Sequence, residues 1–202
     1  MNLIERAKNI LLTPAKEWDV IKGENLTIVD MFTKYAMILA VIPAVAGFIG
    51  FVVIGVSYGF GLNIHWPVGT ALVWMILSYA LSLGGVFLLA FIIDTLAPTF
   101  GCTKNLQAAV KIAVYSFTAV WVVGILAIIP VLSILLWVGI LYTGYLIYLG
   151  IQKLKEPTQD KLIPYFVVSI VALILIYWFV GFIVARIALG SMTSLAGGLG
   201  SF

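Results

Sequence analysis

Charged residues are spread unevenly along the chain and leave three long apolar segments without them. Residues 35–93, 112–152 and 162–185 contain no Asp, Glu, Lys or Arg. A helix needs about 20 apolar residues to cross a hydrocarbon core of about 30 Å. The first segment is therefore long enough for two crossings joined by a short loop at 58–68, and the third for one. The apolar runs are continuous rather than alternating, which favours helices over a barrel.

The middle segment, 112–152, must fold back on itself. As a single helix it would be about 62 Å long, roughly twice the thickness of the hydrocarbon core. Pro130 is the expected turning point, because proline lacks an N–H and restricts the residue before it. The pattern thus predicts an all-α polytopic membrane protein with a five-helix transmembrane bundle. The predicted spans lie near 29–57, 69–97, 109–129, 131–151 and 163–189.

The residues before the first span predict a short amphipathic segment, which we call the lead (1–27). Thr13-Pro14 is typical of the start of a second helix. Two placements stay open: the lead lies in the cytoplasmic headgroup layer, or it packs onto the cytoplasmic ends of the spans. At the other end, 190–202 is small, uncharged and glycine-rich, which predicts a flexible tail after the membrane domain 28–189. The residues predicted to face the membrane surface are Ile4, Ala7, Ile10, Leu11 and Trp18.

Composition supports the membrane assignment and excludes other classes. Apolar residues make up 63% of the chain and charged residues 9%, against about 45–50% and 25% in soluble domains. A single cysteine, Cys102, excludes a disulfide scaffold. The net charge of +3 comes without a basic face, which argues against a nucleic-acid partner. The lipid bilayer is the partner that the composition predicts.

The distribution of cations predicts the orientation. Ten of the eleven Lys and Arg residues fall on one side of the predicted spans, and only Arg186 falls on the other. The positive-inside rule then places the N-terminus in the cytoplasm and the C-terminus outside. No cleavable signal peptide is expected, since the first long apolar run starts after residue 34. The ten cations are Arg6, Lys8, Lys16, Lys22, Lys34, Lys104, Lys111, Lys153, Lys155 and Lys161.

Catalytic and metal-binding patterns are not found in the sequence. There is no G-x-x-x-x-G-K, H-E-x-x-H or G-x-S-x-G pattern. His65 and Cys102 are predicted on opposite sides of the membrane, so they cannot form a catalytic pair or share a metal within one protomer. We therefore expect a protein that is not an enzyme and has no catalytic residues, cofactor or metal site.

Asp94 is the ionisable residue that stands out, because it lies at the inward end of the second span. A carboxylate within the membrane is a candidate proton or cation ligand. The alternative is an interfacial carboxylate that pairs with Lys104 or Lys111, both predicted on the same side. The position near the helix end favours the ion pair.

Pro43 and several hydroxyl-bearing residues are further candidates. Pro43 lies deep in the first span and predicts a kink. Broken helices form binding sites in transporters, but a structural role is favoured here because no second span is interrupted in a matching position. Tyr115, Ser116 and Tyr145 belong to a possible polar seam between helices, for which hydrogen bonding between helices is the favoured use and a solute pathway the alternative.

The sequence resembles the bacterial branch of the Yip family, five-span membrane proteins related to Ypt/Rab-interacting proteins. The similarity covers residues 1–189 and is carried by the lead IERAKNIL with Thr13-Pro14 and Glu17-Trp18. It is carried further by IPAVAGFIG, by AVYSFT and by the long segment from Ile128 to Leu154. The resemblance implies a helical, non-enzymatic protein of the bacterial inner membrane. Eukaryotic relatives act in vesicle trafficking and engage prenylated small GTPases, but their Asp-Leu-Tyr-Gly-Pro type motif is not found here.

Two functions follow from these observations. The first is a non-enzymatic membrane protein that organises its surroundings by binding lipid, another membrane protein or a second copy of itself. The alternative is a small, possibly oligomeric, transporter or channel with a path near Pro43, the hydroxyl groups and Asp94.

Overall fold

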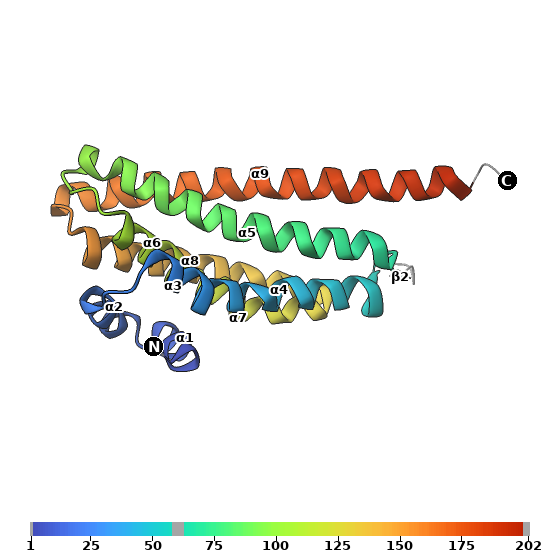
Figure 1. Ribbon diagram of the computed structural model, residues 1–202, viewed down its shortest axis with the longest axis horizontal. Coiled ribbons are helices and arrows are strands. Elements are labelled where there is room, and N and C mark those ends of the chain that lie inside the picture. The colour runs from blue at the N-terminus through green and yellow to red at the C-terminus, as the bar shows by residue number, and fades with distance from the viewer. Residues whose placement is uncertain (1, 58–62, 200–202) are drawn as a thin grey trace.

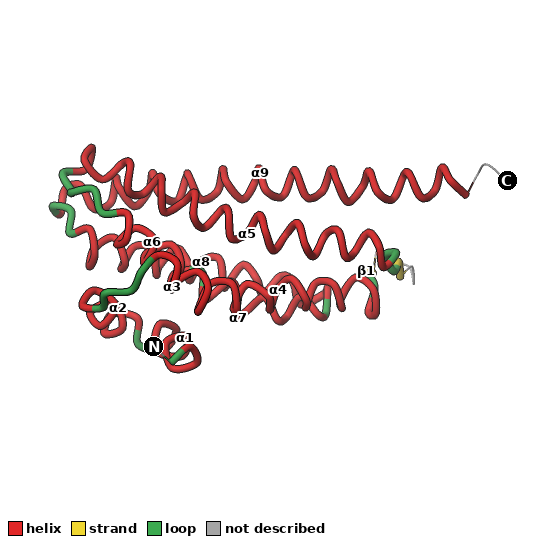
Figure 2. The backbone as a smooth tube through the Cα atoms, viewed as in Figure 1, coloured by secondary structure: helices red, strands yellow, loops and turns green. Residues whose placement is uncertain are grey.

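The computed structural model describes residues 2–57 and 63–199, and helices form almost all of this part (Figures 1 and 2). Figure 1 shows the long helices lying side by side along one axis. Four helical segments are long and apolar enough to cross a membrane, and they correspond to the first, second, third and fifth predicted spans. They are Ile28–Ile54, Val68–Phe100, Leu106–Ile128 and Gln159–Ile187. The protein is therefore an all-α polytopic membrane protein, as the sequence predicts.

The first span is a continuous helix with two π-helical turns. It consists of α3 (Ile28–Met31), the π-helical residues Phe32–Ala36, α4 (Met37–Ile49) and the π-helical residues Gly50–Ile54. A small antiparallel hairpin, β1 (Val56–Ser57) with β2 (Asn63–Ile64), joins it to the second span. Residues 58–62 of the predicted loop lie outside the described part of the chain. The hairpin marks one end of the bundle, which we call the hairpin end.

The second and third spans are also built from consecutive helical segments. The second consists of α5 (Val68–Leu96) and a 3-10 turn, Ala97–Phe100. The third consists of α6 (Leu106–Ser116), α7 (Thr118–Val123) and the 3-10 residues Gly124–Ile128. The opposite end of the bundle contains residues 97–105, and we call it the polar end because charged residues gather there.

The chain turns back at Ile129–Pro130, where the sequence predicts the reversal. A helical segment returns along the third span: the 3-10 residues Pro130–Leu135, α8 (Leu136–Gly150) and the π-helical residues Ile151–Lys155. A Cβ atom at Gly139 would contact Val123, and one at Gly150 would contact Ile112, so the two segments run antiparallel. This segment is not among the four that meet the length and composition of a span.

The last helix, α9 (Gln159–Leu199), is longer than the predicted span. Residues 190–199, for which the composition predicts a flexible end, continue the helix. Leucine, alanine and methionine favour a helix there, although each glycine costs about 1 kcal/mol relative to alanine. Residues 200–202 of the predicted tail lie outside the described residues. In Figure 1, α9 extends beyond the other helices at the hairpin end.

The lead forms α1 (Leu3–Leu12) and α2 (Pro14–Gly23). The Asn2 side chain caps α1 by accepting hydrogen bonds from the N–H groups of Ile4 and Glu5. Pro14 is the first residue of α2, the position where the missing N–H costs nothing. Figure 1 shows both helices beside the bundle near its polar end.

The centre of the molecule is α6. Nine consecutive residues, Ala108–Ser116, are buried, so this helix is covered on every side. Around it, Tyr35 and Tyr115 pack edge to face with ring centres 5.0 Å apart, and Trp18 approaches Tyr115 from α2. Many large apolar side chains on the outer helices are exposed instead, including Val131, Trp137, Leu141 and Ile174. In a membrane these side chains face hydrocarbon, which is as apolar as they are.

Contact between the first and third spans predicts a sensitivity to added volume at Gly50. A Cβ atom there would overlap the carbonyl oxygen of Ala127, whereas one at Gly84 would meet nothing within 4 Å. We expect Gly50→Ala to lower the free energy of unfolding by about 1–3 kcal/mol, because the backbones must separate. Gly84→Ala is the matched control. Thermal unfolding in detergent measures both, and equal melting temperatures would contradict the close contact.

Candidate functional site

A buried arginine connects the lead to the bundle at the polar end. The Arg6 side chain is 5% exposed, its Nη1 donates a hydrogen bond to Glu17 Oε1 at 2.5 Å, and its Nη2 donates to Glu24. The guanidinium also lies 5.4 Å from the ring centre of Tyr115. A buried charge is tolerated when it is paired and hydrogen-bonded. These charges therefore hold α1 and α2 against α6.

Lys111 holds the end of α2 from the other side. It lies on the buried helix α6, and its Nζ donates hydrogen bonds to the backbone carbonyl oxygens of Ile21, at 2.8 Å, and Glu24. Carbonyl groups in the last turn of a helix have no partner within the helix, and a cation there also opposes the negative end of the helix dipole. Lys111 is therefore engaged with the lead and does not pair with Asp94.

The partner of Asp94 is Lys155. Lys155 Nζ donates to Asp94 Oδ1 at 2.7 Å. The Lys155 side chain is 1% exposed and the Asp94 side chain 14%. The same carboxylate oxygen accepts a hydrogen bond from the backbone N–H of Asn105 at 2.6 Å. The expectation of an ion pair is thus confirmed, but its expected partners, Lys104 and Lys111, were wrong. The π-helical turn Ile151–Lys155 carries Lys155 back to the end of α5, a contact between segments 61 residues apart.

Two exposed ion pairs join α2 to the end of the α8 segment. Lys153 Nζ lies 2.8 Å from Asp19 Oδ1, and Lys22 pairs with Glu156. Exposed pairs contribute about 0–1 kcal/mol each and weaken in salt. They locate the lead beside the α8 segment, while the buried pairs supply the stronger constraint.

The predicted polar seam is divided by the structure. Tyr115 and Ser116 lie in the core, and the Ser116 hydroxyl has no hydrogen-bond partner among the described residues. Nearby, the hydroxyls of Tyr35 and Thr118 lie 2.8 Å apart. Tyr145 is 46% exposed and packs beside Tyr142, so it lies outside this group. Tyr115 and Ser116 therefore belong to the packed core, and the hydrogen bond between hydroxyl groups that the structure shows nearby joins Tyr35 to Thr118.

Most of the apolar face of the lead packs onto the protein. Ala7, Ile10 and Trp18 are buried, and a Cβ atom at Gly150 would lie 3.0 Å from the Trp18 ring. This is the second of the two predicted placements. Leu11 is half-buried, but Ile4 is 76% exposed and does not share that buried face.

The buried face of α1 is therefore centred differently from the predicted one. Arg6, which is not among the residues predicted for the apolar face, points inward because Glu17 and Glu24 neutralise it.

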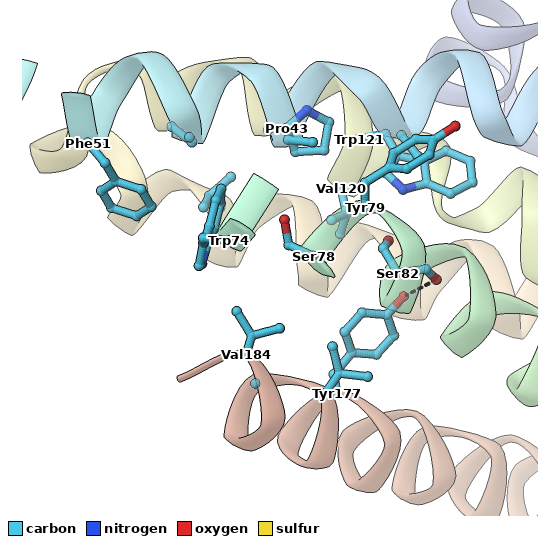
Figure 3. A pocket seen from close by; sticks show the side chains of 18 of the residues that line it. Pro43, Phe51, Trp74, Ser78, Tyr79, Ser82, Val120, Trp121, Tyr177 and Val184 are labelled. Atoms are coloured by element: carbon cyan, nitrogen blue, oxygen red, sulfur yellow. Dashed lines mark hydrogen bonds between the residues drawn. The ribbon is translucent and has the colours of Figure 1, made fainter. Parts of the chain in front are cut away.

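Pro43 lines a cavity of about 650 Å³ between the spans (Figure 3). Residues of α4, α5, α7, α8 and α9 form its walls, and none of them is charged. Pro43 also packs directly against the third span, since a Cβ atom at Gly124 would lie 2.6 Å from its Cβ. The structure thus brings Pro43 to the cavity, whereas Asp94, Tyr115, Ser116 and Tyr145 are not among the lining residues.

Reactive side chains are dispersed. No group of His, Cys, Asp and Glu within residues 2–57 and 63–199 is arranged to hold a metal ion. His65 lies at the hairpin end, with its Nδ1 3.1 Å from the carbonyl oxygen of Val52, and Cys102 lies at the polar end. Burial raises the pKa of the Cys102 thiol, which lowers the fraction of the nucleophilic thiolate.

The fold and these contacts define an integral membrane protein of several helices, with its charges gathered at one end and an apolar cavity within. The chain belongs to the Yip1 domain family, because the Yip1 domain matches residues 8–198. This confirms the resemblance found in the sequence.

A curated relative is the inner membrane protein YohC of Escherichia coli, in strain K12 and in strain O6:H1. The identity is 32% over 153 residues, which cover 73% of this chain and 77% of YohC. By this homology the chain is an integral protein of the inner membrane. No solved structure matches it.

Three features of the site are not evident from the sequence. Arg6 and Lys155 read as ordinary surface cations there, and only the fold shows that both are buried. The cavity depends on aromatic residues from separate helices, such as Trp74 and Tyr177. Gly47 is a partial sign of the cavity in the sequence, because a small residue lets a large ring approach. A Cβ atom at Gly47 would lie 2.5 Å from the Trp74 ring.

The Asp94–Lys155 pair predicts strong coupling between the two positions. We expect Lys155→Met or Asp94→Asn alone to lower the free energy of unfolding by about 3–5 kcal/mol, because each leaves a buried group without its partner. The double variant is expected to lose less than the sum of the two. Chemical denaturation in detergent gives the free energy of unfolding of the starting protein, of the two single variants and of the double variant. Strictly additive losses would contradict the pair, and Lys104→Met, at an exposed lysine, is the control.

Proposed function

We propose that this protein is a non-enzymatic Yip1-domain membrane protein that binds membrane lipid at its cytoplasmic surface through the outward side of the lead. The observation that carries the proposal is the exposed side of α1 and α2, where apolar and cationic residues alternate. The two helices are held rigidly enough by Arg6 and Lys111 to present this side at a fixed position.

On α1, the exposed side consists of Ile4, Lys8 and Leu12, which follow one another at intervals of one helical turn. Ile4 is 76% and Leu12 68% exposed. On α2, Lys16 and the exposed Val20 repeat this spacing. Lys8 and Lys16 have no carboxylate partner within the described residues. Apolar side chains beside free lysines are typical of helices that lie in a headgroup layer with anionic lipids.

The same observations weigh against transport. Asp94, the candidate cation ligand, pairs with the buried Lys155. The cavity near Pro43 is lined without charged residues, so it offers an ion no compensation for its lost hydration. Binding of lipid is favoured over a path for ions.

The orientation proposed with this function has five crossings and a cytoplasmic N-terminus. The Lys153–Asp19 and Lys155–Asp94 pairs hold the end of the α8 segment beside the lead, and its other end lies near the hairpin. Pro130–Lys155 contains 26 residues, enough to cross about 30 Å as a helix. Its tyrosines and glycines lower its apolar character but do not add charge within the segment up to Gln152.

Single cysteines test this topology in a Cys102→Ala background. We expect Asn2→Cys and Lys104→Cys to react with maleimide only after the membrane is opened. His65→Cys and Phe202→Cys are expected to react with an impermeant maleimide in cells whose outer membrane is permeabilised. Labelling of residues 2 and 202 from the same compartment would contradict an odd number of crossings.

Lipid spin labels test the surface role of the lead. A fluorophore is attached at Ala15→Cys in the Cys102→Ala protein, in nanodiscs of phosphatidylglycerol and phosphatidylcholine. We expect spin-labelled phosphatidylglycerol to quench more strongly than spin-labelled phosphatidylcholine. Each lysine near an anionic surface contributes about 1 kcal/mol, so Lys8→Gln with Lys16→Gln, a loss of about 2 kcal/mol, should reduce this preference about thirtyfold.

Lys104→Gln is the matched control, since it removes an exposed cation at the same end of the bundle but outside the lead. An equal loss in this control, or an unchanged preference in the double variant, would refute lipid binding by the lead.

A further inference from the structure

We propose that the cavity beside Pro43 is a binding site for one acyl chain of a membrane phospholipid, which enters from the hydrocarbon phase between α8 and α9. This site is separate from the lead and does not depend on its proposed role.

The cavity is lined by residues of the helices and by Trp66, which lies between β2 and α5. Its volume of about 650 Å³ is within the range of about 300–1,000 Å³ found for ligand sites. Protein interiors are otherwise close-packed, with few voids larger than a water molecule. A space of this size left empty would forfeit many dispersion contacts along its walls. It therefore requires an occupant.

The walls favour hydrocarbon over water. Figure 3 shows Phe51 and Trp74 from the first and second spans on one side and Val184 and Tyr177 of α9 on the other. Phe51 also stacks on Trp66, with ring centres 4.4 Å apart. Buried water needs two to four polar partners for each molecule, and these mostly apolar walls offer few.

Three hydroxyl groups of the walls are already bonded within the protein. Ser78 Oγ donates to the carbonyl oxygen of Met75 at 3.1 Å, and the Tyr79 hydroxyl donates to that of Met37 at 3.1 Å. The Tyr177 hydroxyl donates to the carbonyl oxygen of Ser82 at 3.3 Å, the bond drawn in Figure 3. These three donors are used, and the indole N–H of Trp121 is a buried donor of a lining residue without a partner among the described residues. The cavity therefore selects an occupant mainly by its apolar surface.

The cavity reaches the surface between α8 and α9. Three of its lining residues are themselves exposed: Ile140 on α8, and Gly181 and Ala185 on α9. Lipid chains surround this part of the protein, so an acyl chain can enter sideways without leaving hydrocarbon.

A flexible chain fits better than a helix from a partner. A helix is a stiff cylinder about 10–12 Å in diameter with its side chains, whereas the cavity is an irregular space between residues of five helices. An acyl chain is narrower and can follow the irregular space between Pro43 and Val184, so a single lipid chain is the occupant that we infer.

Brominated phospholipids test the site through tryptophan fluorescence. Trp66, Trp74 and Trp121 line the cavity, whereas Trp137 and Trp178 are exposed to the lipid phase. Trp137→Phe and Trp178→Phe are therefore introduced first. In nanodiscs containing phospholipid with brominated acyl chains, we expect strong quenching of the remaining fluorescence.

Gly181→Leu and Gly84→Leu then form a matched pair in this background. A Cβ atom at either glycine would meet nothing within 4 Å, so both variants should fold, but only Gly181 lines the cavity. We expect Gly181→Leu to reduce the quenching by about half, because leucine takes up the space in which the chain contacts the indoles. Gly84→Leu should leave it unchanged.

Three outcomes would overturn the proposal: equal quenching in both leucine variants, no quenching in the starting protein, or cross-linked dimers through α9 that exclude brominated lipid. Melting temperatures of both variants within a few degrees of the starting protein establish that the fold is retained.

Discussion

Three cations, Arg6, Lys111 and Lys155, lie inside the protein at the polar end of the bundle, and each is held by oxygen atoms: backbone carbonyls for Lys111, and carboxylates for the other two. Removing a charge from water costs several kcal/mol unless an opposite charge and hydrogen bonds replace the lost hydration. Arg6 has Glu17 and Glu24, and Lys155 has Asp94. The first group holds the lead on α6, and the second joins the end of the α8 segment to α5. The arrangement of helices at this end therefore depends on charges that only the complete fold neutralises.

Away from the polar end, the helices are held by close packing at small residues rather than by ion pairs. Gly124 fits against Pro43, and Gly50 lies against the backbone of the third span, so these helices approach closely where side chains are smallest. The large rings of Trp74 and Tyr177 lie beyond this contact and border the cavity with α9. A bundle that is tight on one side and open on the other suits a protein whose surroundings are lipid, since hydrocarbon from the membrane can complete the packing.

Predictions that rest on interactions between neighbours in the chain agree with the structure, whereas predictions about residues far apart in the chain do not. Pro130 marked the reversal correctly because proline acts on its own backbone and on the residue before it. Asp94 was expected to pair with Lys104 or Lys111, the nearest cations in sequence, but Lys155 reaches it through the π-helical end of the α8 segment. For α1, the helical period grouped Ala7 and Ile10 on one apolar face, but they were predicted to face the membrane surface and instead pack onto the protein. The burial of Arg6 was not predicted, since hydrophobicity alone takes no account of a partner on another helix.

The sequence by itself determined that the chain enters the membrane, where its helices lie and which family it belongs to. The first two depend on the length and apolar character of contiguous segments, because a backbone in lipid must form its own hydrogen bonds. The family depends on short motifs such as the one that begins the lead. The tertiary structure decided which charges pair, which side of the lead is buried and where space remains between the helices. Those features depend on contacts between residues far apart in the chain, and no local pattern of hydrophobic and polar positions records them.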